Sequence, residues 1–166
     1  MVAWAFSIAA AGIFPALTLG VWWKRATTQG AIAGMILGYG VCVYYLVGTR
    51  YYAVSFHEMW SWISWAPPAA QARYTELHAA WMAASGAAKD AAWIALDRQA
   101  QVVAGWFGVR NISAALFGLP FGFLGIWLVS LFTPEPSKEV QDMVERTRLP
   151  AGALIMQDKA ADLGGH

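Results

Sequence analysis

Charged side chains are scarce in this chain of 166 residues, and three long stretches contain none. Asp, Glu, Lys and Arg make up 13% of the sequence, against roughly 25% in soluble domains. The uncharged stretches cover residues 1–23, 26–49 and 111–134. A helix needs about 20 mostly apolar residues to cross a bilayer. The lack of charge therefore argues against an ordinary soluble domain and predicts an all-α integral membrane protein with three transmembrane helices.

The chain also has only one cysteine and almost no net charge. Cys42 is the single cysteine, so the chain cannot hold an internal disulfide framework, and we expect Cys42 to be a small packing residue. The net charge of +1 argues against nucleic acid as a partner. Residues 1–23 carry no basic residue before their apolar run, which is not the pattern of a signal peptide.

Residues that perform catalysis or bind metals form no strong pattern. A Gly-rich phosphate loop and a nucleophile elbow are both missing, so we expect neither an enzyme nor a bound cofactor. His57 and His78, with Glu58 and Glu76 nearby, would permit a two-His, two-Glu metal site. Exposed polar residues on a helical hairpin explain the same pattern, and that is the preferred interpretation.

Ionisable residues are missing from all three predicted spans. Such residues inside a membrane mark ion pathways and proton relays, so these spans show no proton relay of their own. Ser7, Thr18 and Ser130 are candidates for weak Na⁺ coordination, although a lone hydroxyl in a span more often bonds its own backbone. The sequence therefore assigns no catalytic, cofactor-binding or metal-binding residue.

The first two spans carry clear marks at their ends. The first, residues 1–23, contains Pro15, which tends to kink a helix, and ends in two tryptophans followed by Lys24 and Arg25. Aromatic residues beside basic residues are typical of a cytoplasmic membrane interface. The loop at 24–29 is short, so the second span, residues 30–49, returns antiparallel to the first.

Glycines recur along one face of the second span, at Gly30, Gly34 and Gly38. This four-residue spacing places all three on one smooth stripe of a helix. Such a stripe lets another helix approach closely, and lipid gives no comparable reason for it. We therefore expect Gly34, at the centre of the stripe, to face another helix at close range.

Residues 50–110 have a different composition from the spans. Trp60, Trp62 and Trp65 alternate as in a strand, but a short interfacial segment is preferred because it directly follows a span. Two helical patterns with apolar stripes follow, interrupted at Ser85-Gly86. They predict an amphipathic helical hairpin outside the membrane.

The third span and the tail complete the chain. Residues 111–133 form the span, and the sequon Asn111-Ile-Ser113 is interpreted as its polar start. The prolines of Pro134-Glu-Pro136 stop it. The tail, residues 134–166, begins with a short amphipathic helix, and we expect poor order after Pro150.

The orientation follows from the loop with Lys24 and Arg25. Basic residues in short loops stay in the cytoplasm, whereas long segments translocate largely regardless of charge. The N-terminus and residues 50–110 are then expected outside, and the tail inside.

Several stretches of the sequence together resemble a known family, the sodium:solute symporters, with the acetate permease branch the most similar. The first part of the chain is similar to late helices of that family, and the later part to its last span and cytoplasmic end. The stretches are Phe6–Ala11, Phe14-Pro15, Leu19–Arg25, Thr27–Met35, Leu116–Phe123, Leu128–Pro136, Val140–Val144 and Arg148–Pro150.

The resemblance implies a 13-helix transporter built on two inverted repeats, of which this chain would match the last three helices. The family's sodium and substrate sites lie mostly on earlier helices, so no binding residue is carried over. Na⁺ enters only as the coupling ion of the intact transporter.

The implied partners are the lipid bilayer, the remaining helices of the symporter in cis or trans, and a small monocarboxylate through the intact transporter. The implied location is the bacterial inner membrane, with the chain multi-pass. The alternative is a small membrane accessory or assembly protein derived from such a transporter, without transport activity.

Overall fold

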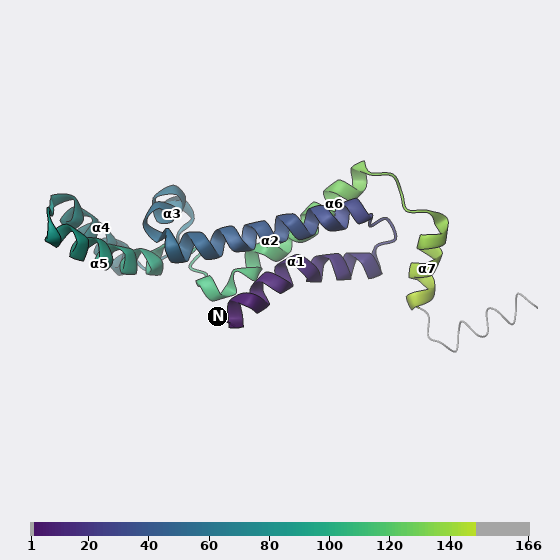
Figure 1. The fold of residues 1–166 in the computed structure, drawn as a ribbon, viewed down its shortest axis with the longest axis horizontal. Coiled ribbons are helices and arrows are strands. Elements are labelled where there is room, and N and C mark those ends of the chain that lie inside the picture. The colour runs from purple at the N-terminus through teal and green to yellow at the C-terminus, as the bar shows by residue number, and fades with distance from the viewer. Residues whose placement is uncertain (1, 149–166) are drawn as a thin grey trace, which may run out of the picture. The chain divides into compact units, whose positions relative to one another are not determined.

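The computed structural model describes residues 2–148 and is built from helices, with no strand in that range (Figure 1). The prediction of an all-α protein is confirmed. The predicted disorder after Pro150 falls outside the described residues. The helices are α1 (Val2–Trp22), α2 (Thr28–Tyr51), α3 (Ala53–Trp60), α4 (Pro68–Ala83), α5 (Ala87–Val103), α6 (Ala115–Phe132) and α7 (Lys138–Arg148), with short 3-10 turns at Ser61–Ile63 and Asn111–Ser113.

Three helical segments are long and apolar enough to cross a membrane, as predicted. They are α1, α2 and the segment Asn111–Phe132, which joins the second 3-10 turn to α6. The second helix begins at Thr28, two residues earlier than expected. The reason is the Thr27 hydroxyl, which accepts a hydrogen bond of 3.1 Å from the backbone N–H of Gly30. A threonine in this position satisfies a donor that the first helical turn would otherwise leave unpaired.

The chain divides into two compact units. Among the described residues, one comprises 2–8 and 40–117, and the other 9–39 and 118–148. We call them the aromatic unit and the glycine unit, after the residues that pack at their centres. The chain passes from one unit to the other within α1, α2 and near the start of α6.

The glycine unit is held together by close contacts between helices. A Cβ atom added at Gly122 of α6 would lie 2.8 Å from the Pro15 ring and 3.1 Å from the Ala11 carbonyl oxygen, both on α1. A Cβ added at Gly125 would lie 3.0 Å from the Cα of Gly34 on α2. The small residues thus allow α1 and α2 to approach α6 to backbone contact, which is the kind of packing that stabilises helices in lipid.

The aromatic unit is centred on Tyr45 of α2, whose side chain is completely buried. Its ring lies 4.8 Å from the ring of Phe117 and 5.1 Å from that of Trp106, measured between centroids. Its hydroxyl donates a hydrogen bond of 2.6 Å to the carbonyl oxygen of Val109. Cys42 is likewise fully buried one turn earlier, as expected for a packing residue.

The hairpin predicted between the spans is present as α4 and α5, which lie side by side (Figure 1). Helix α3 was not predicted from the sequence; it includes Trp60 and precedes the 3-10 turn that holds Trp62. Trp65 follows outside the helices. These tryptophans form no strand. Ser64 and Trp106 make one isolated bridge. Trp60 packs against the ring of Trp106, and Trp65 against that of Phe107.

Candidate functional site

The contact between α2 and α6 is the most specific structural feature of the glycine unit. A Cβ atom at Gly34 would lie 2.6 Å from the carbonyl oxygen of Gly122 and would also collide with the side chain of Ile126. At Gly38 an added Cβ would meet the carbonyl oxygen of Ala11 on α1. The prediction that Gly34 faces another helix at close range is confirmed, and the partner helix lies in this chain.

Hydroxyl groups form hydrogen bonds between the start of α2 and the end of α6 in the same unit. The hydroxyls of Thr27 and Thr133 lie 2.8 Å apart, and the backbone N–H of Thr27 donates a bond of 3.2 Å to the hydroxyl of Ser130. Ser130 is completely buried. The Ser130 hydroxyl therefore accepts a hydrogen bond from the backbone just before α2. This structural role was not predicted from the sequence.

The other two hydroxyls considered for Na⁺ coordination bond to backbone carbonyls. Thr18 donates a bond of 2.8 Å to the carbonyl of Phe14, four residues earlier in its own helix. Ser7 donates one of 2.9 Å to the carbonyl of Ile112. Ser7 belongs to the aromatic unit, whereas Thr18 and Ser130 belong to the glycine unit, and each has its own hydrogen bond.

Ion pairs connect the loop after α1 to the segment after α6. The ammonium of Lys24 lies 2.8 Å from a carboxylate oxygen of Glu145, and the guanidinium of Arg25 lies 3.5 Å from one of Glu135. Exposed pairs of this kind contribute at most about 1 kcal/mol. Their value is geometric, because they place the loop and the start of the tail at the same end of the glycine unit.

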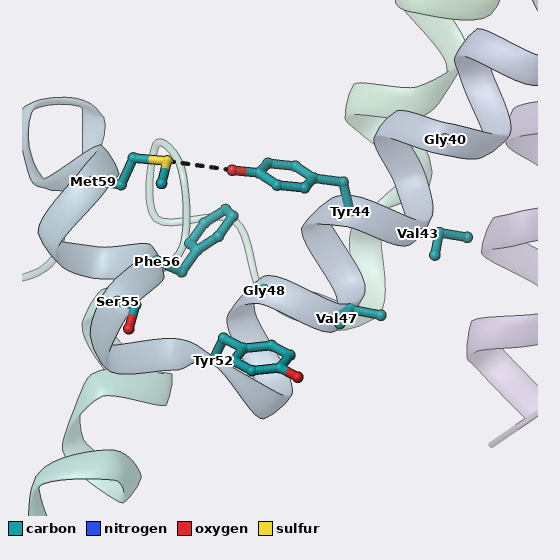
Figure 2. A pocket seen from close by; sticks show the side chains of 9 residues that line it. All are labelled: Gly40, Val43, Tyr44, Val47, Gly48, Tyr52, Ser55, Phe56 and Met59. Atoms are coloured by element: carbon teal, nitrogen blue, oxygen red, sulfur yellow. Dashed lines mark hydrogen bonds between the residues drawn. The ribbon is translucent and has the colours of Figure 1, made fainter.

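An apolar groove of about 530 Å³ lies in the aromatic unit between the second half of α2 and α3 (Figure 2). Figure 2 shows the side chains of Tyr44 and Met59 pointing toward each other, and the Tyr44 hydroxyl lies 3.5 Å from the Met59 sulfur. No charged side chain lines the groove. Its mostly apolar lining suits a hydrocarbon surface.

The histidines that suggested a metal site lie in the aromatic unit, but without the expected set of partners. Glu76 pairs with Arg73 at 3.0 Å, whereas the Nε2 of His78 lies 3.6 Å from a carboxylate oxygen of Glu58. Within residues 2–148, no group of three or more His, Cys, Asp or Glu side chains is arranged to hold a metal ion.

His57 departs from the preferred interpretation of exposed polar residues on the hairpin. It lies on α3 and is only 8% exposed, because its ring packs 4.6 Å from the ring of Tyr74 on α4. Burial lowers the pKa of His57, while the backbone of Val103 and the charge of Glu58 oppose that shift. The imidazole is therefore neutral at neutral pH and serves as a packing group between α3 and the hairpin.

The chain is similar to known transport proteins in two comparisons. Residues 1–38 match the model of the sodium:solute symporter family. Over 144 residues, 87% of the chain, the sequence is 29% identical to an uncharacterized symporter of Cupriavidus necator. The chain spans 15% of the length of that relative. No solved structure matches the chain.

These similarities agree with the resemblance to sodium:solute symporters found in the sequence. The matched residues 1–38 cover α1, the basic loop and the glycine stripe of α2. The family match therefore includes Gly34 and Gly38, which make close helix contacts in the glycine unit.

Proposed function

We propose that this chain corresponds to the C-terminal portion of a sodium-coupled symporter for acetate or a related small monocarboxylate. In this role it supplies scaffold helices, while ion and substrate sites belong to the rest of the transporter. The observation that carries the proposal is the symporter family match over residues 1–38. Those residues form a helix pair packed on small residues rather than a polar site.

The chemistry of the described helices supports a scaffold role. The spans α1, α2 and α6 hold no Asp, Glu or His, and Arg50 stands at the last turn of α2. Intramembrane ionisable groups are the usual marks of an ion or proton path. The candidate hydroxyls of these helices are engaged with protein partners, so what this part of the chain offers a transporter is rigid packing.

The test is a chimera in which this chain replaces the matching segment of the Cupriavidus necator symporter. We expect the chimera to fold, and we expect both the chimera and the intact relative, measured side by side, to take up labelled acetate into vesicles under an inward sodium gradient. The chain alone should give no sodium-dependent uptake above that of empty vesicles, because it lacks intramembrane charge.

Each failure has a distinct meaning. Sodium-dependent uptake by the chain alone would refute the scaffold role. A chimera that does not fold while the relative does would show that this chain is not equivalent to the segment it replaces. A folded chimera that transports another solute and not acetate would contradict the proposed substrate alone.

For the membrane we propose a bacterial inner membrane, with the N-terminus and residues 50–110 outside and the loop at 24–29 inside. The basic pair in the short loop supports this orientation. The Lys24–Glu145 and Arg25–Glu135 pairs support placing the tail on the same side as the loop.

Single-cysteine labelling in a Cys42→Ala background tests this topology. We expect a probe at Ala87 to react with an impermeant reagent from outside, and probes at Thr28 and Ser137 to react only after the membrane is opened. All three positions are exposed in the structure. Labelling of Thr28 but not Ala87 from outside would mean the opposite orientation, and different behaviour of Thr28 and Ser137 would contradict the ion pairs.

A further inference from the structure

A second cavity of the aromatic unit, of about 540 Å³, is chemically unlike the apolar groove. Its walls come from the last turn of α2, the last turns of α5 and the loop between α5 and the third span. Arg50 and Arg110 both line it, together with the side chains of Thr49, Gln101 and Asn111. No acidic residue is part of its lining.

The two arginines leave most of their hydrogen-bonding capacity unused. Arg50 donates one bond of 2.7 Å to the side-chain oxygen of Gln101, whose amide nitrogen donates one of 2.9 Å to Asp97, a residue that does not line the cavity. The guanidinium of Arg110 has no hydrogen bond or ion pair with any residue of the range 2–148. A guanidinium carries five N–H donors, so most of the donors of Arg50 and all of those of Arg110 have no acceptor among the described residues.

The loop that carries Arg110 is held in place by buried hydrogen bonds. The hydroxyl of Tyr45 donates to the carbonyl oxygen of Val109, the residue before Arg110. The side-chain amide of Asn111, the residue after it, donates to the Thr49 hydroxyl at 2.7 Å and to the Leu46 carbonyl at 3.1 Å. The two neighbours of Arg110 in the chain are therefore both hydrogen-bonded to the end of α2, where Arg50 also lies.

The start of this loop is also constrained. Phe107 has a φ of 51°, and Gly108 has a φ of 72°. A positive φ is uncommon for a residue with a side chain and persists only where the surroundings enforce it. Here the backbone N–H of Phe107 donates to the carbonyl of Ile63 at 2.9 Å. Arg110 is thus carried by a constrained loop, and Arg50 by the last turn of α2.

We propose that this cavity binds an oxyanion, and that the anion is the phosphate of a phospholipid headgroup. Arg50 closes the second candidate span, and Asn111 opens the third, so the cavity lies where two spans end. Phosphate groups are found at that level of a bilayer, outside its hydrocarbon core of about 30 Å. The planar guanidinium matches the geometry of a phosphate and can bind it through two parallel hydrogen bonds.

The experiment uses the full chain in detergent, with binding of phosphatidylglycerol measured by native mass spectrometry and by the shift of the thermal unfolding midpoint. Arg110→Gln and Arg50→Gln are each expected to weaken binding at least about tenfold, because each removes charged hydrogen bonds to the phosphate. Arg98→Gln is the matched control, since Arg98 is an exposed arginine of α5 outside the cavity. It should leave binding unchanged.

The variants also separate a built site from general surface charge. Arg110→Lys keeps the charge but not the paired donors, and we expect it to bind between wild type and Arg110→Gln. If Arg50→Gln does not fold because its bond to Gln101 is lost, Arg110→Gln still decides the question, since Arg110 has no protein partner to lose.

Two results would overturn the proposal. Equal binding of phosphatidylglycerol by wild type, Arg110→Gln and Arg98→Gln would show that the cavity is no anion site. Arginine-dependent binding of inorganic phosphate or acetate, without binding of phosphatidylglycerol, would overturn the lipid source and identify a soluble anion instead. Displacement of phosphatidylglycerol by inorganic phosphate from wild type, and not from Arg110→Gln, would support recognition of the phosphate.

Discussion

Tyr45→Ala is expected to lower the free energy of unfolding by about 3 kcal/mol. Truncating a buried aromatic residue costs about 3–5 kcal/mol in soluble proteins. We expect the lower end of this range because lipid is itself apolar. Burying a ring away from lipid gains little from the hydrophobic effect, and mainly the packing contacts are lost. Tyr45 is completely buried, and its ring contacts those of Phe56, Trp106 and Phe117.

Thermal unfolding in detergent, followed by tryptophan fluorescence, measures this effect because Trp106 lies against the lost ring. Tyr45→Phe keeps the ring and removes the bond to Val109, so it should cost about 1–3 kcal/mol for the carbonyl left without this donor. Tyr51→Ala is the matched control, since Tyr51 belongs to the same helix and is 63% exposed. Equal losses for Tyr45→Ala and Tyr51→Ala would mean that the aromatic cluster is not the core of its unit.

Gly34→Leu is expected to destabilise the glycine unit by close to 3 kcal/mol, the upper end of the usual cost of overpacking. The upper end is expected because the added atoms meet the carbonyl oxygen of Gly122 as well as Ile126. A side chain can rotate away, but a backbone carbonyl can move only with its helix. Separating α2 from α6 would forfeit packing that lipid does not replace.

Two substitutions in the same helix serve as controls for Gly34→Leu. Ile36→Leu changes the shape of a side chain that is 67% exposed without adding volume. Gly40→Ala adds a methyl group where no atom lies within 4 Å, and it should be neutral or stabilising, since alanine favours a helix over glycine by about 1 kcal/mol. The folded yield and the unfolding midpoint in detergent report the outcome. A Gly34→Leu variant as stable as both controls would show that the glycine stripe faces lipid.

The spans and the glycine stripe were predictable because composition and spacing act locally. An uncharged run of sufficient length is compatible with a bilayer wherever it lies in the chain. Glycines four residues apart share a helix face whatever the fold. The identity of the helix that meets Gly34 was not predictable, since a smooth stripe accepts any close partner, and only the structure places α6 there.

The short helix α3 and the ion pairs at the loop were missed for a related reason. An eight-residue helix is marginal by itself, and α3 is stabilised by packing of Phe56 and His57 against rings from distant segments. The partners of Lys24 and Arg25 lie more than a hundred residues later in the chain. Periodicity within a window carries no information on such contacts.

By itself the sequence determined that this chain is helical, that three of its segments suit a membrane, and which helix face allows close approach. The tertiary structure decided which of two neighbouring tyrosines is the core: Tyr45 is completely buried, whereas Tyr44 is 44% exposed. It also decided that Arg50 and Arg110 share one cavity. The physical reason is that hydropathy and small-residue spacing are properties of a segment, whereas burial and the meeting of charges depend on long-range packing that no single segment contains.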